Sequence, residues 1–399
     1  MSVAAPSDRD RPVHARRRRS RSSFVDRVFR VSLALHVPVA VAWAGALALL
    51  GVPWPLLGGV ALAALATLPI RGRMASMLWD RPRSRAERLL VDEPYFVHWC
   101  AAFGAAAPIT LACAIVPLVD LARGLPPHLP TTLAFALYAA FFALALWGVI
   151  VRRRWVVVRR LDVAVRELPP AFDGYRIVQL SDLHIGGLTP REVAARWVSL
   201  ANREGADLAV LTGDYVTSGV EFHDDIAAIM AELRATDGVF ASLGNHDYFG
   251  EGEPLVGKIR ARGVTVLRNE SRSIERGGAT IRLAAVDDTW TGRADLATTL
   301  RDVGDDATVL LAHDPDLFEE AARLGADVVL SGHTHGGQIA FPFLARFLNL
   351  SQLAHRRTYG RYTLGDATLY VHGGLGTTGP PIRLGVPPEI AVLTLRRAS

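Results

Sequence analysis

The chain has 399 residues, 50% of them hydrophobic, and a formal net charge of +5. This length accommodates one good-sized domain together with a second region. The hydrophobic surplus lies almost entirely before residue 152, as does much of the arginine. A single soluble domain is therefore excluded as an account of the whole chain. The two cysteines, Cys100 and Cys113, fall about 20 Å apart on one predicted helix, which excludes a disulfide between them.

Residues 1–23 are basic and rich in serine, and we expect them to form a disordered tail. Four apolar stretches follow, each close to the roughly 20 residues that a membrane-spanning helix needs. Pro53, Pro55 and two glycines weaken the second stretch, and buried core helices are the alternative interpretation. Because no matching amphipathic helices lie nearby, we predict an all-α transmembrane region of about four helices over residues 24–151. The stretches are residues 31–50, 54–70, 97–119 and 131–151.

Arginine placement predicts the orientation of these spans. Arginines cluster at residues 16–30, 71–88 and 152–160, whereas the connections at 51–53 and 120–130 are almost free of them. Because basic loops stay on the cytoplasmic side, both termini are expected in the cytoplasm, with the spans in a bacterial inner or plasma membrane. The positive charge then reflects topology and attraction to anionic headgroups, and no nucleic-acid partner is expected. A twin-arginine export signal is the alternative for the first cluster, but three further apolar stretches and no clear cleavage site argue against it.

After a transition at residues 152–174, apolar runs that resemble strands alternate with helical patterns. Helices are predicted at residues 190–203, 223–233 and 254–262. This alternation is typical of an α/β domain with much parallel strand pairing. We assign that domain to residues 152–399.

Short polar elements follow five of the predicted strands, at residues 175–180, 208–212, 239–243, 308–312 and 328–331. Side chains at strand ends converge on one edge of a sheet, so the side chains of these elements are expected to lie close together. The elements are, in chain order, Asp182-Leu183-His184, Gly213-Asp214, Gly244-Asn245-His246-Asp247, His313 and Gly332-His333-Thr334-His335.

These elements supply oxygen and nitrogen donors without a thiolate, a set that suits Mn²⁺, Fe²⁺ or Zn²⁺. The donors suffice for two divalent metal ions, and the carboxylate of Asp214 can bridge both. A shared carboxylate holds two metals about 3.5–4 Å apart, and a water between them would lose a proton near neutral pH and attack phosphorus. The predicted metal ligands are Asp182, His184, Asp214, Asn245, His313, His333 and His335.

His246 and Asp247 are the predicted catalytic residues. His246 lies beside a predicted ligand and needs no metal itself, so we expect it to stabilise the phosphoryl oxygens or to protonate the leaving group. Asp247 is expected to hold the ring of His246 and to favour its imidazolium form.

The ordered series D-L-H, G-D, G-N-H-D, H and G-H-T-H resembles the calcineurin-like metallophosphoesterase superfamily. The surrounding residues 179–184, 331–339 and 374–390 are similar to a bacterial branch of membrane-anchored phosphohydrolases. The resemblance covers about residues 160–396 and misses no metal-ligand position. It implies two packed mixed β-sheets flanked by helices.

The resemblance also implies roles for individual residues. Asp214 would be shared between the two metals, and His246 would be catalytic. Members of the superfamily hydrolyse phosphomonoesters or phosphodiesters, and some relatives cleave the pyrophosphate of nucleotide-linked lipid precursors. The implied ligands are Asp182, His184, Asp214 and His335 for one metal, and Asp214, Asn245, His313 and His333 for the other.

The sequence does not assign a single role to four further residues. Asp287 and Asp288 follow an apolar run, and they either orient metal ligands or form a turn or helix cap. Arg383 either clamps a phosphate through two hydrogen bonds or pairs with a carboxylate. His372 is left outside the metal set because the resemblance does not require it.

Residues 341–353 (FPFLARFLNLSQL) are unusually apolar for a stretch that directly follows the last metal-donor motif. One interpretation is core packing. The other is an apolar cap that faces the bilayer and admits a substrate with acyl chains.

We therefore predict a metal-dependent phosphoesterase that hydrolyses a phosphomonoester, phosphodiester or pyrophosphate bond, on a membrane-associated or lipid-linked substrate. A protein phosphatase is the first alternative, although long insertions typical of such enzymes are missing. The second alternative is a metal-bound membrane scaffold or sensor with weak catalysis, although His246 and every ligand position are intact. The substrate, the native metals and the oligomeric state are not predicted.

Overall fold

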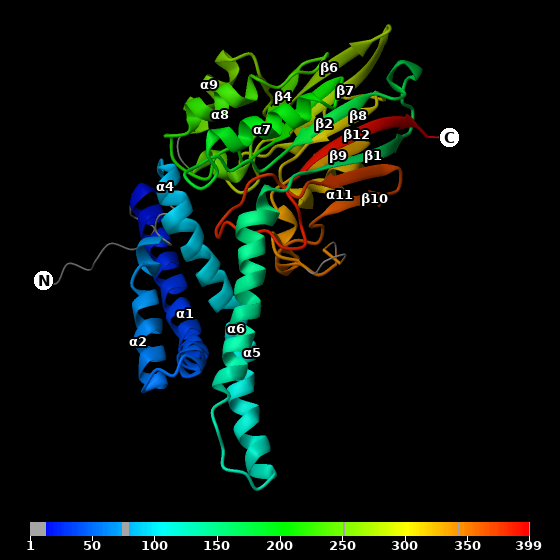
Figure 1. Ribbon diagram of the computed structural model, residues 1–399. Coiled ribbons are helices and arrows are strands. Elements are labelled where there is room, and N and C mark those ends of the chain that lie inside the picture. Colours follow the sequence, from blue (N-terminus) through cyan, green and yellow to red (C-terminus); the bar gives the residue numbers. More distant parts are fainter. Residues whose placement is uncertain (1–12, 74–79, 250–251, 341–343, 346, 399) are drawn as a thin grey trace, which may run out of the picture. The chain divides into compact units, whose positions relative to one another are not determined.

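The structure is a computed structural model that describes residues 13–73, 80–249, 252–340, 344–345 and 347–398 (Figure 1). The chain divides into two compact units. The first comprises Met1–Trp79 and Leu89–Trp147, and the second comprises Asp80–Arg88 and Gly148–Ser399. The domain boundary predicted at residue 152 stays a prediction.

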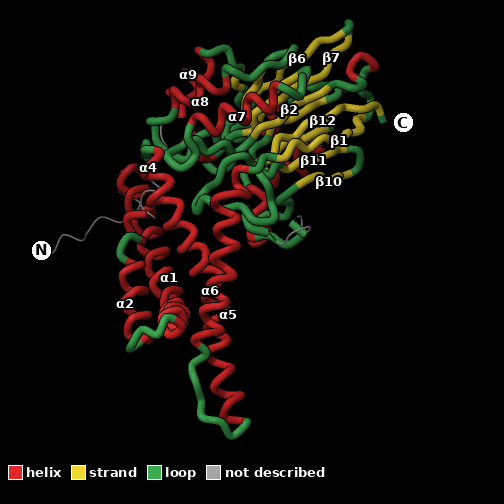
Figure 2. The backbone as a smooth tube through the Cα atoms, in the orientation of Figure 1, coloured by secondary structure: helices red, strands yellow, loops and turns green. Residues whose placement is uncertain are grey.

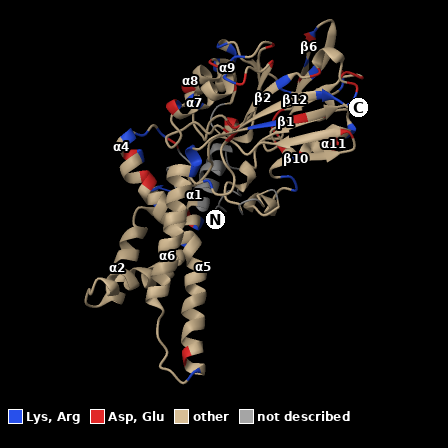
Figure 3. Ribbon diagram, turned by 45° about the vertical axis from the view of Figure 1, so that its right-hand side comes forward, with Lys and Arg blue, Asp and Glu red and all other residues tan. Residues whose placement is uncertain are grey.

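Within the described residues, four helical segments are long and apolar enough to cross a membrane, which confirms the predicted all-α region. In Figure 3, few positions along the ribbons of these helices have the colours of charged residues. Helix α1 begins at Val13, inside the tail expected at residues 1–23, of which residues 1–12 lie outside the described residues. The candidate spans are Val25–Leu49, Pro55–Arg73, Arg85–Ala122 and Thr131–Arg154. Their helices are α1 Val13–Leu49, α2 Pro55–Thr67, α4 Arg85–Glu87, α5 Glu93–Ala122 and α6 Thr131–Leu146, with π-helical turns at Arg88–Asp92 and Trp147–Val151.

Close approach and polar pairing hold the helices of the first unit together. A Cβ atom at Gly59 of α2 would overlap the carbonyl of Ala40 in α1, and small residues of this kind let membrane helices pack tightly. His36, His98 and Tyr138 form a hydrogen-bonded chain across three helices, with 3.1 Å between the two Nε2 atoms and 2.7 Å from His98 Nδ1 to the tyrosine hydroxyl. Polar groups in an apolar bundle are thereby paired within the protein.

The second unit contains two six-stranded sheets, with strand orders β1-β12-β2-β3-β4-β5 and β10-β11-β9-β8-β7-β6. Only the β12–β2 pair is antiparallel in the first sheet, and the second sheet is antiparallel at its two outer pairs, β10–β11 and β6–β7. The predicted pair of mixed sheets is confirmed (Figure 2). The strands are β1 Val157–Val165, β2 Arg176–Leu180, β3 Leu208–Thr212, β4 Val239–Ser242, β5 Thr265–Val266, β6 Glu270–Arg276, β7 Ala279–Ala285, β8 Thr308–Leu311, β9 Val328–Ser331, β10 Gly360–Leu364, β11 Ala367–Val371 and β12 Glu389–Arg397.

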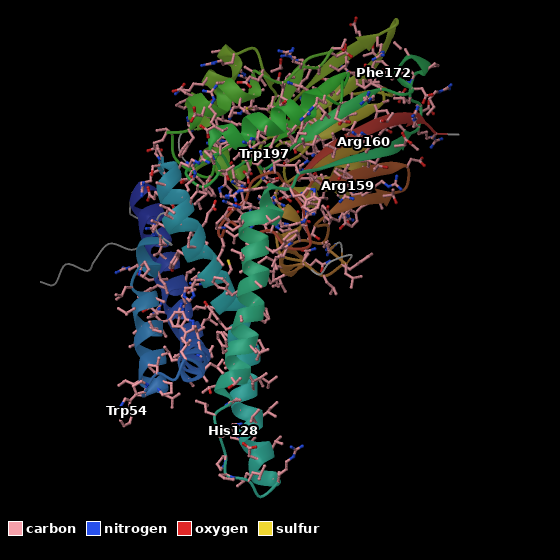
Figure 4. The ribbon with its side chains drawn as sticks, in the orientation of Figure 1. Trp54, His128, Arg159, Arg160, Phe172 and Trp197 are labelled. Atoms are coloured by element: carbon pink, nitrogen blue, oxygen red, sulfur yellow. The ribbon has the colours of Figure 1, made fainter. Side chains whose placement is uncertain are left out.

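Alternate residues of each central strand enter different cores. In β2, Ile177 lies in the core between the two sheets, and Val178 lies in the core beneath the helices that cover the first sheet. Trp197 of α7 belongs to this second core (Figure 4). Both faces of the strand are therefore buried, which is why the apolar residues Ile177 and Val178 are adjacent in its sequence instead of alternating with exposed polar ones.

Helices cover the outer face of each sheet. Those on the first sheet match the three predicted helices, and those on the second sheet pack against β8, β9 and β11 through Leu296 and Phe318. The first group is α7 Arg191–Asn202, α8 His223–Met230 and α9 Gly252–Ala261, and the second is α10 Leu296–Thr299 and α11 Phe318–Arg323.

Charged side chains tie β1 to its surroundings. Arg159 and Arg160 are neighbours on this strand (Figure 4). Arg159 donates to the buried carboxylate of Glu389 over 3.0 Å, and Arg160 pairs with Glu204 over 2.7 Å. Strand β1 is thus bonded both to its partner strand β12 and to the turn between residues 202 and 208, which precedes β3.

Candidate metal centre

The five polar elements lie directly after five strands of the second unit. Three follow β2, β3 and β4 of the first sheet, and two follow β8 and β9 of the second sheet. The strand positions match those expected from the apolar runs, since the predicted runs and the observed strands end within a residue of one another. The donors therefore come from both sheets and meet at one end of the two-sheet core.

Most of the donors adopt an unusual backbone conformation. Among the described residues other than glycine, nine have a positive φ, and five of these are Asp182, His184, Asp214, His333 and His335, with φ between 44° and 71°. The left-handed region is unfavourable for side chains with a Cβ atom, and residues held there are concentrated at functional sites. The loops thus hold these side chains at some cost in backbone energy.

One group of donors consists of Asp182, His184 and His335. The Nε2 atoms of the two histidines are 3.0 Å apart, and His335 Nε2 is 3.3 Å from Asp182 Oδ1. All three side chains are buried. Their ligand atoms lie within 4.8 Å of one another, as a shared cation requires.

A second group consists of Asp214, His313 and His333. Asp214 Oδ2 is 3.2 Å from His313 Nε2 and 3.7 Å from Nε2 of His184, which belongs to the first group. The Asp214 carboxylate therefore lies between histidines of both groups. Its other oxygen accepts a hydrogen bond of 2.9 Å from the backbone N–H of His246.

Asn245 supplies an independent indication of a cation. Its Oδ1 atom is buried and has no hydrogen-bond partner among the described residues, and the same holds for Nδ1 of His333. Leaving a buried acceptor unpaired costs about 1–3 kcal/mol. A cation bound by the amide oxygen would remove this cost, so the residues present fit two divalent ions.

Burial and neighbouring charges set the protonation of the donors. Burial lowers the pKa of His184 to about 3 and that of His333 to about 4, so both rings keep a free lone pair. Burial opposes ionisation of Asp214, but His313 and His246 outweigh it and hold the pKa of this carboxyl well below its ordinary value. Burial opposes protonation of His313, but Asp214 outweighs it and raises the pKa of this ring to about 10. Because metals bind ionised carboxylates and neutral imidazoles, His313 must lose a proton when a metal binds.

His246 is held by a backbone carbonyl. Its Nδ1 atom is 2.7 Å from the carbonyl oxygen of Thr217, so Nδ1 carries a hydrogen and donates it. The ring also lies perpendicular to that of His184, with 4.8 Å between the centroids. The Nε2 atom is consequently free of this carbonyl contact. His246 also forms, with His184 and Asp214, a further group whose ligand atoms lie within 4.8 Å of one another.

Asp247 does not hold the ring of His246, contrary to expectation. Its carboxylate accepts hydrogen bonds from the backbone N–H groups of Asp214, Tyr215 and Gly244, at 2.8–2.9 Å. Burial raises the pKa of Asp247 to about 7. The side chain therefore fixes the loop that carries Asp214, and Thr217 takes over the ring-holding role.

The residues with open interpretations lie outside both donor groups. Asp287 accepts hydrogen bonds from the Tyr248 hydroxyl over 2.6 Å and from Arg268 over 2.9 Å, and Asp288 accepts from backbone N–H groups of the following turn. His372 is buried and accepts from the Gly374 N–H over 2.9 Å. These contacts are structural.

Arg383 is fully buried, and it donates to backbone carbonyls instead of a carboxylate. Its Nη1 atom is 2.7 Å from the Gly373 oxygen, and Nε is 3.1 Å from the Gly376 oxygen. Nη2 is 3.3 Å from Nδ1 of His335. Arg383 thus joins the loop before β12 to a metal-donor histidine, which its isolated position in the sequence did not indicate.

Comparisons with known proteins agree with this arrangement. A family profile described as calcineurin-like phosphoesterase matches residues 175–337. The uncharacterized metallophosphoesterase YkuE of Bacillus subtilis is 34% identical over 234 residues, which cover 57% of this chain and 82% of that protein. An uncharacterized metallophosphoesterase of Aquifex aeolicus is 30% identical, covering 60% of this chain and 91% of its own length. A transmembrane protein with metallophosphoesterase domain from Danio rerio is 30% identical, covering 64% of this chain and 61% of its own length.

Proposed function

Because this chain belongs to the calcineurin-like metallophosphoesterases, we propose that two divalent ions bind at the end of its two sheets. Membership of this family makes the chain a metal-dependent phosphoesterase. The observation that carries this proposal is the position of Asp214 Oδ2, 3.2 Å from His313 and 3.7 Å from His184. A carboxylate placed between histidines of both groups is suited to bridge two ions. The proposed ligands are Asp182, His184, Asp214 and His335 for one ion, and Asp214, Asn245, His313 and His333 for the other.

Two bound cations would neutralise charge on the phosphoryl group and supply an activated water for attack at phosphorus. Mn²⁺, Fe²⁺ and Zn²⁺ all suit the donor set. The protein's part is to hold the donors in buried loops, where water cannot compete with them.

His246 supplies the proton in the proposed reaction. As a bond forms between water oxygen and phosphorus, the bond from phosphorus to the leaving oxygen breaks, and His246 Nε2 donates a proton to that oxygen. The hydrogen bond from Nδ1 to the Thr217 carbonyl supports this role, because it orients the ring and leaves Nε2 for the substrate. Asp247 contributes indirectly by fixing the backbone of Asp214 and Tyr215.

We further propose that residues 24–151 span a bacterial inner or plasma membrane and that residues 152–399 form a cytoplasmic catalytic domain. The four candidate spans support the first part. The arginine clusters at residues 16–30, 71–88 and 152–160 support the orientation.

The substrate is proposed to be a phosphoester attached to, or associated with, a lipid. The support comes from the stretch after the last donor motif, whose residues 341–343 and 346 lie outside the described residues. Leu344, Phe347, Leu348, Leu350 and Leu353 are 44–90% exposed, which disfavours core packing. Large exposed apolar patches are typical of surfaces that bind membranes or partners.

This apolar stretch is connected to the end of the last candidate span. Ala340 forms a β-bridge with Asn349, and its N–H donates to the Leu384 carbonyl over 2.9 Å. A Cβ atom at Gly148, where the span Thr131–Arg154 enters the second unit, would meet the side chains of Ile382 and Leu384. The exposed leucines therefore belong to a segment that is bonded, within the second unit, to the residues packed on Gly148.

The test uses the purified full chain in mixed micelles. With Mn²⁺ it should hydrolyse bis(p-nitrophenyl) phosphate or p-nitrophenyl phosphate, and a chelator should abolish the activity. Activity that survives exhaustive chelation contradicts the metal-dependent reaction.

The lipid proposal is tested separately, by comparing hydrolysis of phospholipids and nucleotide-linked lipids in micelles with hydrolysis of soluble nitrophenyl esters. Phe347→Ser with Leu348→Ser should lower turnover of lipid substrates and spare the soluble esters. Leu364→Ser, which changes a 43% exposed leucine on the edge strand β10, is the matched control. Equal activity of the double variant and the control on lipid substrates contradicts a lipid-facing role.

A further inference from the structure

A short segment that begins between the second and third candidate spans, and includes the first residues of the third, belongs to the catalytic unit. Asp80–Arg88 lies in the same compact unit as the two sheets, whereas the residues on either side belong to the helical unit. The segment contacts two loops, Ile185–Gly187 after β2 and Val216–Ser218 after β3, which pair through a parallel bridge between Ile185 and Val216. Both loops carry groups that hold the proposed active site.

Asp80 makes polar contacts with both loops. Its two carboxylate oxygens each lie 3.1 Å from the backbone N–H of Gly187. Its own backbone N–H donates to the Ser218 hydroxyl over 3.4 Å. One residue of the inter-span segment thus bonds both loops at once.

Two glycines make room for the segment. A Cβ atom at Gly186 would overlap the carboxylate of Asp80, and one at Gly187 would overlap the carbonyl of Arg81 and approach Cγ of Arg83. Neither glycine has a φ in the left-handed region, so the backbone conformation does not require glycine. The close approach of residues 80–83 does.

The contacted loops lead directly to two histidines of the site. Gly187 is three residues from His184, and Ser218 follows Thr217. The Thr217 hydroxyl donates to the His184 carbonyl over 3.4 Å, and the Thr217 carbonyl accepts from His246 Nδ1 over 2.7 Å. Gly187 and Ser218 are therefore connected, through a few contacts, to the hydrogen bond that orients His246.

We propose that Asp80 is a positioning residue for His246, acting through Gly187, Ser218 and the Thr217 carbonyl. The segment Asp80–Arg88, which precedes both sheets in the chain, then helps to position the proposed proton donor. This inference rests on the role proposed for His246 in protonating the leaving group.

The test measures how much the rate depends on the leaving group. Protonation by His246 matters for an alkyl phosphoester, whose alkoxide is a poor leaving group, and matters little for a nitrophenyl ester. In the full chain, Asp80→Ala should lower kcat for the alkyl ester by roughly tenfold, because a small misplacement of a catalytic group can cost up to about 100-fold. The nitrophenyl rate, KM and metal content should change little.

Further variants separate positioning from folding. Asp80→Asn should restore the alkyl rate, because an amide oxygen also accepts from the Gly187 N–H. Gly187→Ala should reproduce the loss, because its Cβ displaces Arg81. The matched glycine control is Gly257→Ala in α9, where a Cβ atom would have nothing within 4 Å, and its alkyl rate should equal that of the wild type.

A double-mutant cycle decides the outcome. In a His246→Ala background, Asp80→Ala should cause no further loss on the alkyl ester. The positioning role of Asp80 is overturned if the losses of the two single variants multiply in the double variant. It is also overturned if Asp80→Ala lowers the rates on both esters equally and lowers the metal content. Neither result affects the role proposed for His246. If His246→Ala leaves the ratio of alkyl to nitrophenyl rates unchanged, the proposed role of His246 fails and this inference fails with it, while metal-dependent hydrolysis stands.

Discussion

At the scale of single residues, Asp214 contacts more of the proposed site than a ligand of one metal would need to. Its carboxylate is buried, and a buried charge is costly unless it is paired. Here Oδ2 faces His313 and His184, while Oδ1 accepts from the N–H of His246. The side chain therefore links both donor groups to the proposed proton donor.

Replacement of Asp214 is expected to remove metal as well as activity. Losing an outer partner of a metal ligand costs roughly 10–100-fold in affinity or rate, so loss of a bridging ligand should exceed that range. Metal content measured by mass spectrometry on Asp214→Ala should fall together with nitrophenyl ester turnover. Asp224→Ala is the control, since Asp224 forms an exposed ion pair with Lys258. Full metal content in the Asp214 variant contradicts a bridging role.

Asp80 should make thermal stability depend on pH. Burial raises the pKa of its carboxyl to about 6, against the opposing effect of Arg83 and the N–H groups of Gly187 and Arg81, with Glu221 adding to the increase. A folded-state pKa above the unfolded value contributes stability at low pH that is lost as pH rises. The Tm of the wild type relative to Asp80→Asn should therefore decline between about pH 4 and pH 6 and stay constant above. A constant Tm difference across this window contradicts the raised pKa.

At the scale of elements, the loop before β12 depends on Arg383. The guanidinium group donates to the carbonyls of Gly373 and Gly376 and faces Nδ1 of His335. Arg383→Ala would leave buried carbonyls unpaired, at a cost of about 1–3 kcal/mol each.

We expect Arg383→Ala to lower both Tm and metal affinity, because His335 loses the group that orients its ring. Unfolding followed by fluorescence, together with metal titration, measures the two effects. Arg301→Ala, which changes an exposed arginine bonded to Thr298, should alter neither. A lower Tm with unchanged metal affinity contradicts a connection between this loop and His335.

These elements also show what the sequence could and could not predict. The strands before Asp182, Asp214 and Asn245 were predictable because strands buried on both faces form continuous apolar runs. The partners of His246 and His335 were not, because Thr217 and Arg383 act through a backbone carbonyl and a guanidinium group that only the folded loops bring close. Asp247 was misassigned for the same reason, since its three N–H donors come from the loop that follows β3 and from Gly244.

At the scale of the whole molecule, the chain combines a helical region that can span a membrane with a phosphoesterase of two sheets. The number of spans was predictable from apolar length, because a bilayer sets the length of a helix. The membership of Asp80–Arg88 in the catalytic unit was not predictable. That segment looks like an ordinary basic loop, and only the close fit of its backbone to Gly186 and Gly187 distinguishes it.

The orientation of the spans is testable with single cysteines, after Cys100 and Cys113 are replaced by alanine. His128 lies in the connection between α5 and α6 (Figure 4), and its side chain is 64% exposed. Asp366, between β10 and β11, is 68% exposed. Because basic loops stay in the cytoplasm, a membrane-impermeant maleimide should label His128→Cys in right-side-out vesicles and Asp366→Cys only in inverted ones. The opposite pattern would place the catalytic unit outside the cytoplasm. Labelling of both cysteines in sealed vesicles of one orientation would contradict the single span predicted between positions 128 and 366, and with it the predicted four-span topology.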